Sequence, residues 1–441
     1  MIKYFYSTAI SILVASGHVA ADNDRSVAIS DLSAVVSHLD ALLQSSAPPD
    51  TEMAEQLVRE HLALTRLAQA TFGNYLENSL EDYDALLPSP NFQRLVEYYR
   101  NRLLKAYQQR LSADFASQLQ SPALQGLHFE KLHLDGRRGR AEFRALVDNR
   151  SLTIHADLVP VDQTWKIAEL TIAGRPISQH YQHLYQDLID NNYSLPVLET
   201  ALAKRDFIAL DDFSATWDGH HPMDWGPWKE KDRQKPMLYW IESSGDQHYM
   251  TARDSSHSVI VGKFIHWNPR QYPIMSWCWQ ATALPPGGNE FLDDANDSAA
   301  GLYVIFSQNW LGIPKQLKYV WSSTLPEGTV GRRDKIFRPW FFVVESGPDN
   351  LGTWTFETVD LEQNHRDKLG SEPAERTIGL GLLTDANSTR SYAEAYYADL
   401  RVWTREALEN KRITNHCGAL PKQLTHTAYK SNAGSAFGAE E

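Results

Sequence analysis

Residues 152–188 constrain the fold of this chain more than any other stretch. Their first part alternates between apolar and polar side chains, which is the period of a β-strand that buries one face. The apolar positions are Leu152, Ile154, Ala156 and Leu158. A polar turn at residues 162–163 leads into a second expected strand, residues 164–173, which Gly174 ends. This stretch therefore predicts a β-hairpin with one apolar face.

A helix is expected directly after the hairpin. Apolar and aromatic residues recur there at the spacing of one helical face: Ile177, Tyr181, Leu184, Tyr185 and Leu188. Tyrosines on such a stripe are most often part of a core, so a packing role stands beside any ligand-binding role.

The hairpin, Trp165 after its turn, the break at Gly174 and the tyrosine-containing helix together resemble the MlaC-type family. Members of that family are periplasmic phospholipid carriers, also called toluene-tolerance or ABC-transporter auxiliary proteins. The resemblance covers about residues 57–202. Glu169 stands where the family has an acidic residue, whereas the family's Gly-x-Ser step is altered here to Gly174-Arg175-Pro176-Ile177-Ser178. The resemblance implies a phospholipid ligand, a membrane lipid-transport complex as partner and a periplasmic location.

The length and the distribution of residue types predict two folded domains. A chain of 441 residues is too long for one ordinary core, and twelve of its thirteen tryptophans follow residue 204. The expected organisation is a signal peptide at residues 1–21, a lipid-carrier domain at 22–205, a β-sandwich domain at 206–406 and a helical or disordered tail at 407–441.

The formal net charge of −13 argues against a nucleic-acid partner, which would require basic patches. The same charge provides no general attraction to anionic lipid surfaces. Any contact with lipid is therefore expected inside an apolar pocket.

The N-terminus has the pattern of a secretory signal. Lys3 supplies a short positive region, an apolar run follows, and Val19-Ala20-Ala21 offers small residues for cleavage. The mature chain is then expected to begin at Asp22 and to reside in the periplasm. An uncleaved membrane anchor is the alternative, since the apolar run is near the lower limit for a span.

The first domain is expected to have an α+β fold, with helices on a curved four-stranded antiparallel sheet. Helical patterns occupy residues 29–43, 51–72 and 91–111, and Asn91 is the expected N-cap of the last. Strands are expected at residues 127–134 and 140–147, ahead of the hairpin.

The inner face of this sheet and the helices that cover it are candidate walls of a lipid cavity. The candidate floor comprises Ala141, Phe143, Ala145, Val147, Leu152, Ile154, Ala156 and Leu158. The candidate helical wall and rim comprise Tyr99, Leu103, Tyr107, Tyr181, Leu184 and Tyr185. Small alanines among larger residues suit a cavity wall, but ordinary packing uses them as well. Periodicity leaves open whether side chains fill the space.

Short strands separated by Pro and Gly turns follow residue 206, which is typical of a β-sandwich or jelly roll. They are expected at residues 238–242, 258–264, 274–281, 301–306, 317–321, 340–345, 353–360, 377–384 and 395–403. A short helix and a polar tail, disordered from about residue 422, complete the chain.

This second half resembles a bacterial β-sandwich family of unknown function that is related to carbohydrate-binding jelly rolls. The matching motifs are Leu210-Asp211-Asp212-Phe213, Asp293-Asp294, Tyr319-Val320-Trp321-Ser322, Val344-Glu345-Ser346-Gly347, Thr384-Asp385-Ala386-Asn387-Ser388-Thr389 and Tyr397-Ala398-Asp399. The resemblance implies the fold and assigns no activity.

Carboxylates and tryptophans in this half allow two kinds of sugar chemistry. The carboxylates that would suit a glycoside-cleaving pair are Glu290, Asp293, Asp294, Glu345 and Asp385. No established catalytic motif accompanies them, so no enzymatic activity is expected. Trp225, Trp228, Trp267 and Trp310 lie near expected loops and are candidates for a sugar-stacking platform. Trp240, Trp277, Trp279 and Trp321 lie in expected strands and are more typical of a core.

A structural calcium ion is the only cofactor that the residues suggest. Asp211 or Asp212, near the first strand, and Asp399, near the last, carry the hard oxygen ligands that calcium prefers. Ordinary turn caps are the alternative for these carboxylates. The two cysteines, Cys278 and Cys417, form one disulfide or stay reduced, since their spacing alone fixes no geometry.

The chain is therefore expected to be a periplasmic phospholipid carrier that serves an ABC-type lipid transport system and carries an appended β-sandwich. The alternative is an envelope glycan-binding or scaffold protein without lipid transport.

Overall fold

The computed structural model describes residues 26–35, 51–80, 89–119, 124–147, 150–333 and 338–422. The chain consists of two units that meet between Arg205 and Asp206. The expected signal peptide and the polar end of the tail lie outside the described residues. Among the described helices, none combines the length and the apolar character needed to cross a membrane.

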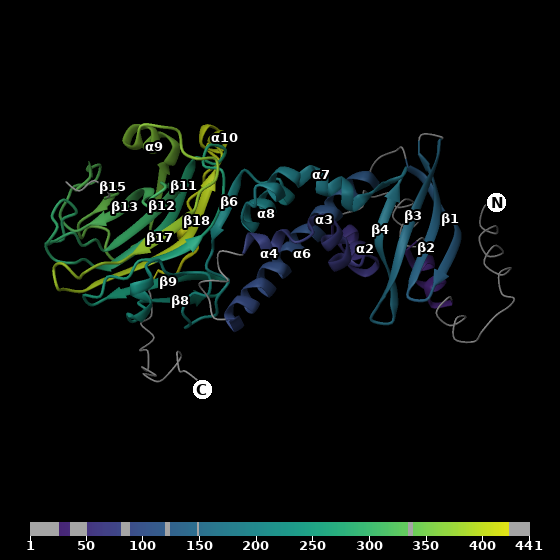
Figure 1. Cartoon of the computed structure of the whole chain (residues 1–441), viewed down its shortest axis with the longest axis horizontal. Helices are drawn as coiled ribbons and strands as arrows, with labels where there is room; N and C mark the ends of the chain where they lie inside the picture. The colour runs from purple at the N-terminus through teal and green to yellow at the C-terminus, as the bar shows by residue number, and fades with distance from the viewer. Residues whose placement is uncertain are drawn as a thin grey trace. The chain divides into compact units, whose positions relative to one another are not determined.

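Helices make up much of the N-terminal unit (Figure 1). They are residues 26–35, α2 (Thr51–His61), α3 (Leu64–Phe72), α4 (Tyr75–Ser79), α6 (Ser89–Leu119), α7 (Ile177–Asp190) and α8 (Leu195–Ala203). The single helix predicted at residues 51–72 is wrong in its middle. There the N–H of Ala63 donates to the carbonyl of Ile167 in the sheet at 2.8 Å, and Leu62 forms a bridge with the same residue. The connection to the sheet therefore separates α2 from α3.

Two further helix predictions need correction. Asn91 is not an N-cap, because α6 already begins at Ser89. The helix α8 was not predicted, although its start has a recognisable signal. Ser194 stands at the N-cap position and Pro196 lies in the first turn, where the missing proline N–H costs no helical hydrogen bond.

The sheet of this unit contains the strands predicted from the sequence. Its strands are β1 (Leu124–Asp135), β2 (Arg138–Val147), β3 (Arg150–Val161), β4 (Thr164–Ile172) and the short β5 (Arg175–Pro176). Within the described residues they pair in chain order, each antiparallel to the next. Both residues of the β3–β4 turn, Asp162 and Gln163, have positive φ, which matches the twist of a tight hairpin. Helices and an antiparallel sheet together give the expected α+β class.

The free edge of β4 is covered along its length. The carboxylate of Asp31 accepts the N–H of Trp165 at 2.7 Å, Ala63 bonds the middle of the strand, and β5 pairs with its end. Figure 1 shows α2 and α3 beside this edge of the sheet. Contacts of this kind protect a strand edge against pairing with another chain.

The C-terminal unit is built almost entirely of strands. They are β6 (Phe207–Asp211), β7 (Gly226–Pro227), β8 (Tyr239–Ser244), β9 (Gln247–Asp254), β10 (Val261–Phe264), β11 (Ile274–Ala283), β12 (Ala300–Gln308), β13 (Pro314–Ser322), β14 (Val330–Gly331), β15 (Trp340–Ser346), β16 (Thr355–Asp360), β17 (Gly379–Leu383) and β18 (Ala393–Trp403). Two short helices, α9 (Leu361–Leu369) and α10 (Arg405–Glu409), accompany them.

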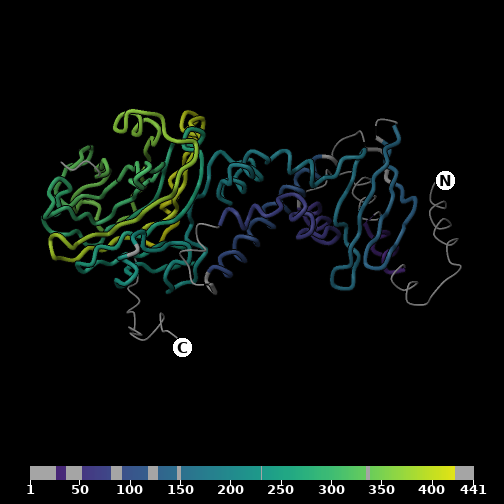
Figure 2. The backbone as a smooth tube through the Cα atoms, in the orientation of Figure 1, coloured from purple at the N-terminus to yellow at the C-terminus, as the bar shows by residue number. Residues whose placement is uncertain are grey.

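These strands form two sheets in the described part of the unit. One has the order β14-β15-β13-β12-β17-β10-β7, and the other has the order β16-β11-β18-β9-β8, with β6 paired to β18. Strand β18 runs as a long yellow-green arrow through the unit, with β6 beside it (Figures 1 and 2). Neighbouring strands are antiparallel except for β13 and β15.

Aromatic side chains join the two sheets. Trp277 of β11 in one sheet contacts Tyr319 of β13 in the other, with ring centroids 5.7 Å apart, and Trp279 contacts Trp321 at 6.1 Å. All four side chains are fully buried. The unit is thus a β-sandwich, as the sequence predicted.

The strands β6, β7, β9 and β14 and the helix α9 of this unit were not predicted. Strand β9 pairs with β8 on one side and β18 on the other, and most of its residues are buried, so it lacks a period-two pattern. Helix α9 buries only Leu361 and His365 and therefore has no apolar stripe. Its cap is nevertheless clear, because Asp360 accepts a hydrogen bond from the N–H of Gln363.

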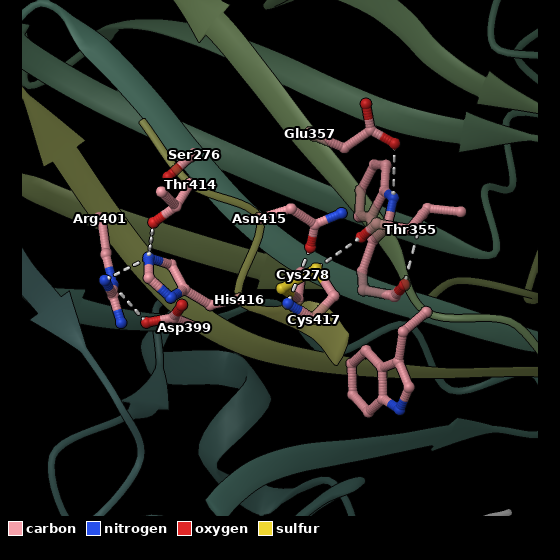
Figure 3. The surroundings of a disulfide bond; sticks show 12 residues. Ser276, Cys278, Thr355, Glu357, Asp399, Arg401, Thr414, Asn415, His416 and Cys417 are labelled. Atoms are coloured by element: carbon pink, nitrogen blue, oxygen red, sulfur yellow. Dashed lines mark hydrogen bonds and ion pairs between the residues drawn. A yellow bond between two sulfur atoms is a disulfide. The ribbon is translucent and has the colours of Figure 1, made fainter. Parts of the chain in front are cut away.

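Cys278 of β11 and Cys417 form a disulfide bond. Figure 3 shows the bond beside Thr355 and Asn415. Close by, Leu420 is buried, and the carbonyl of Pro421 accepts a hydrogen bond from Trp354. The disulfide therefore fastens the segment after α10 to the sandwich.

Candidate functional site

Register places the predicted floor residues of the N-terminal unit on one face of the sheet. Ala141 lies opposite Ala156, Phe143 opposite Ile154, and Ala145 opposite Leu152. Leu158 continues the same face beside Ile167 of β4. Val147 lies at the end of β2, and its side chain is outside the described surfaces. The two predicted rows of the floor are therefore adjacent in space.

One row of this face runs across β1 to β4 and is apolar at every position. It consists of Phe129, Phe143, Ile154 and Ile172 in direct register. The rings of Phe129 and Phe143 contact each other, with centroids 5.8 Å apart. Phe143 is buried, but Phe129 is 40% exposed and Ile172 is 37% exposed. The apolar face thus continues beyond the part that the rest of the unit covers.

The next row of this face has smaller side chains at its centre. Leu132 and Leu170 flank Ala141 and Ala156, and both alanines are fully buried. The centre of this row is therefore covered by the rest of the unit. Leu152 and Ile154 are partly buried, whereas Ala145 and Leu158 are buried.

The predicted tyrosines of the helical wall are buried, and their hydroxyl groups have partners. The ring of Tyr107 contacts Phe72 at 5.1 Å and Tyr181 at 5.5 Å, both edge to face. The hydroxyl of Tyr107 hydrogen-bonds to Thr71 at 2.9 Å, and Tyr181 donates to the carboxylate of Asp114 at 2.6 Å. Burial raises the pKa of both tyrosines well above the ordinary value, so both hydroxyls stay protonated.

The remaining helical candidates divide into two groups. Tyr99, Leu103 and Tyr185 are buried within the unit. Leu184 is 51% exposed, so it does not share the buried face of Tyr185. The helical wall is therefore a packed aromatic cluster, and the uncovered apolar surface belongs to the sheet.

Glu169 connects the sheet to the start of α7. Its carboxylate accepts hydrogen bonds from the backbone N–H of Ser178 at 3.2 Å and from the Ser178 hydroxyl. The sequence Gly174–Ser178 differs from the Gly-x-Ser step of the resembled family, but its serine contacts the acidic residue Glu169. This contact fixes the start of α7 relative to the sheet.

A pocket of about 620 Å³ lies in the C-terminal unit. Its floor includes Tyr303 of β12, Lys318 of β13 and Phe341 of β15, and loop residues form its rim. Three of the five carboxylates predicted from the sequence line it: Glu290, Asp293 and Asp385. Glu345 instead accepts hydrogen bonds from Ser346 and Asn350, and Asp294 is not among the lining residues.

Serine hydroxyls and Lys318 hold Glu290 in place. Its carboxylate accepts hydrogen bonds from Ser298 at 2.9 Å and from Ser322 at 2.6 Å. The Lys318 ammonium donates to the Ser298 hydroxyl at 3.1 Å and lies 5.6 Å from the ring centre of Tyr303. Glu290 and Lys318 are both buried.

Asp385 also lines the pocket, and it lies in the loop that follows β17. Burial, together with the neighbouring charge of Asp297, raises the pKa of Asp385 to about 6, although the charge of Lys318 acts in the opposite direction. Asp297 is fully buried and accepts the backbone N–H groups of Ser388 and Thr389. These hydrogen bonds to Asp297 therefore hold the loop that carries Asp385.

The tryptophans predicted as a sugar platform lie in different environments. Trp228 is partly buried and lines the pocket. Trp225 and Trp267 belong to the core, and Trp310 is 90% exposed outside the lining. Among those predicted as core, Trp277, Trp279 and Trp321 are fully buried, whereas Trp240 is partly buried and stacks on His221.

Sequence reasoning missed Lys318 and Tyr303. A signal for Lys318 was present, because a lysine inside the otherwise apolar run Leu317–Trp321 must either be paired or face a polar space. No comparable signal distinguishes Tyr303 from the core aromatics.

The carboxylates predicted to bind calcium have protein partners in the structure. The carboxylate of Asp211 accepts hydrogen bonds from the Lys263 ammonium at 2.8 Å and from the Trp225 indole at 2.6 Å. Asp399 instead bonds Arg401 at 2.6 Å, and Figure 3 shows Arg401 between Asp399 and His416. The cation beside Asp211 is thus a lysine.

Asp212 likewise has a local role, because it accepts hydrogen bonds from the N–H and hydroxyl groups of Ser214. Across the described ranges, no group of three or more His, Cys, Asp or Glu side chains is arranged to hold a metal ion.

Residues 223–401 match the profile of a protein family of unknown function, DUF3047. This match lies in the half of the chain that resembles a β-sandwich family without an assigned activity. No curated protein matches the chain.

Solved structures show distant likenesses. A phospholipid-binding protein from Ralstonia solanacearum, solved with a phospholipid, is 14% identical, with 40% of this chain and 96% of that chain covered and a TM-score of 0.32. The glycoside hydrolase domain of Endo-D from Streptococcus pneumoniae is 9% identical, with 38% and 20% covered and a TM-score of 0.21. The carbohydrate recognition domain of Emp47p is 12% identical, with 45% and 94% covered and a TM-score of 0.25.

Proposed function

We propose that the N-terminal unit binds the acyl chains of a phospholipid on the apolar face of its sheet. The observation that carries this proposal is the continuous row from Phe129 to Ile172, whose two ends are exposed. Exposed apolar surface that continues a buried row is typical of a binding surface for an apolar ligand.

The energetics of acyl chains suit such a surface. Each methylene removed from water contributes about 0.8 kcal/mol, so a few methylenes on the row supply useful affinity without a charged anchor.

The wider role in this proposal is transport. With its expected signal peptide, the protein would carry phospholipid through the periplasm for an ABC-type membrane transport complex. This part of the proposal rests on the sequence resemblance and on the N-terminal pattern of the chain.

The test is to purify the exported full-length protein without detergent and to identify bound lipids by mass spectrometry. Wild-type protein is expected to carry phospholipid or to extract it from vesicles. Ile154→Arg and Phe129→Arg place a charge on the row and should abolish that binding. Phe129 is already 40% exposed, so its replacement threatens the fold least.

The matched control is Thr153→Arg, because Thr153 is the exposed neighbour of Ile154 and points to the other face of β3. It should retain bound lipid, and circular dichroism should show the same fold for every variant. Wild-type protein that carries no lipid and extracts none would contradict the proposal and favour the envelope glycan-binding or scaffold role.

A further inference from the structure

We propose that the pocket of the C-terminal unit binds a neutral saccharide. The pocket is separate from the lipid-binding face, and the inference does not depend on the proposed lipid function. Its volume of about 620 Å³ lies within the usual range for small-molecule sites, about 300–1,000 Å³.

The floor offers hydrogen-bond donors that the protein itself does not use. Lys318 is only 7% exposed, yet its ammonium makes a single hydrogen bond, to Ser298, among the described residues. An ammonium has three N–H donors, so two remain for a ligand. A buried donor without a partner is unfavourable, and a ligand hydroxyl oxygen would satisfy it.

Acceptors lie beside these donors. Glu290 and Asp385 both line the pocket and are 3% and 4% exposed. A carboxylate has acceptor sites for about four hydrogen bonds, and Glu290 uses two of them for Ser298 and Ser322. Neighbouring donors and acceptors of this kind match adjacent hydroxyl groups, each of which donates one hydrogen and accepts another.

Aromatic rings complete the recognition of a sugar. Trp228, Tyr303 and Phe341 line the same pocket, and the face of a sugar ring carries C–H groups that pack on aromatic carbon. The ring of Trp228 is fixed by Gly262, because any side chain at that glycine would occupy the space of the indole. This close approach holds the tryptophan at the edge of the pocket.

The charges favour a neutral ligand over an anionic one. Around the floor, three buried carboxylates, those of Glu290, Asp297 and Asp385, outnumber the buried ammonium of Lys318. Three further cations line the pocket. Arg333 is already paired with Asp293 at 2.9 Å, whereas Lys229 and Arg338 are exposed, where solvent screens their charges. A sugar carboxylate or phosphate would therefore meet net repulsion at the floor.

Calorimetry or saturation-transfer NMR on the full-length protein tests this assignment with named probes. Glucose, galactose, mannose, N-acetylglucosamine, maltose, cellobiose and lactose are the neutral probes, and glucuronate and glucose 6-phosphate are the anionic ones. At least one neutral probe should bind with a Kd of about 10 mM or below, and both anionic probes should bind at least about tenfold more weakly than the neutral probe that binds most tightly.

Asp385→Asn and Trp228→Ala should each weaken binding by at least about tenfold. The matched controls are Asp349→Asn and Trp310→Ala, since both residues are exposed and neither lines the pocket. Unchanged thermal unfolding of each variant would show that the loss is local.

The assignment is wrong if no neutral probe binds at about 10 mM, or if an anionic probe binds more tightly than every neutral one. It is also wrong if Trp310→Ala lowers affinity as much as Trp228→Ala does. None of these outcomes bears on phospholipid binding by the other unit.

Discussion

The carboxylate of Glu169 in β4 accepts hydrogen bonds from both the backbone N–H and the hydroxyl of Ser178, in the first turn of α7. A carboxylate at a helix N-terminus accepts hydrogen bonds from free N–H groups, and its negative charge interacts favourably with the positive end of the helix dipole. This pair of contacts sets where the helix starts relative to the sheet, although the intervening residues depart from the pattern of the resembled family.

Glu169→Ala is expected to destabilise the N-terminal unit by about 1–2 kcal/mol, because it removes an N-terminal capping interaction with charge. The measurement is urea unfolding of the full-length protein, monitored for the transition of that unit. Glu97→Ala, an exposed position on α6, is the control and should change stability by less than about 0.5 kcal/mol. Equal effects of the two substitutions would rule out the capping role.

Reduction of the disulfide is expected to destabilise the C-terminal unit by about 2–5 kcal/mol. The bond joins residues 139 positions apart and holds the last described segment against β11. Differential scanning calorimetry with and without reductant should show a lower Tm for one transition only. The double variant Cys278→Ser and Cys417→Ser should reproduce the reduced state. A Tm that reductant leaves unchanged would contradict this expectation.

Lys263→Met is expected to destabilise the C-terminal unit by about 3–5 kcal/mol. The Lys263 ammonium lies 2.8 Å from Asp211 and 2.6 Å from Asp224, and all three side chains are buried. Removing the lysine leaves two carboxylates close together without their cation. Lys231→Met, at an exposed position, is the control for denaturant unfolding. A loss below about 1 kcal/mol would contradict this expectation.

Glu357→Gln is expected to stabilise the C-terminal unit at pH 8 and to have little effect at pH 4. Burial, together with the charges of Glu345 and Glu327, raises the pKa of Glu357 from 4.5 to about 7. Because the folded pKa is raised, the stabilising contribution of its proton is complete below pH 4.5 and is lost as pH rises through 7.

Glutamine stays neutral and can still accept the hydrogen bond from the Trp279 indole that Glu357 accepts at 3.1 Å. The gain at pH 8 should be about 2 kcal/mol, since partial exposure of the side chain reduces the full effect. Thermal unfolding between pH 4 and pH 8 measures it, and Asp349→Asn is the exposed control. A gain that is the same at both pH values would show that ionisation is not its source.

Local sequence patterns were sufficient for elements whose burial is one-sided. Alternation from Leu152 to Leu158 predicted β3 and the side of the sheet that its residues face, because the strand period fixes that relation without any distant contact. Trp277 and Trp279 were expected in the core because they lie in an expected strand, and both are fully buried in β11.

Long-range contacts decided the remaining features. The hydrogen bond from Ala63 to Ile167 ended α2 where the apolar stripe would have continued, and a pattern read along one helix contains no information about it. Strand β9 pairs with a strand along each edge, and residues on both of its faces are buried. Its sequence therefore shows no alternation between apolar and polar residues.

The charged sites show most clearly which features the sequence determined and which depended on the tertiary structure. Sequence identified Asp211 and Asp385 as carboxylates with potential functions, and composition alone established that much. Only the tertiary structure placed Lys263 against Asp211 and put Asp385 in one pocket with Lys318. A carboxylate interacts with whichever partner the fold brings within a few ångströms, and the pairing of strands distant in sequence determines that partner.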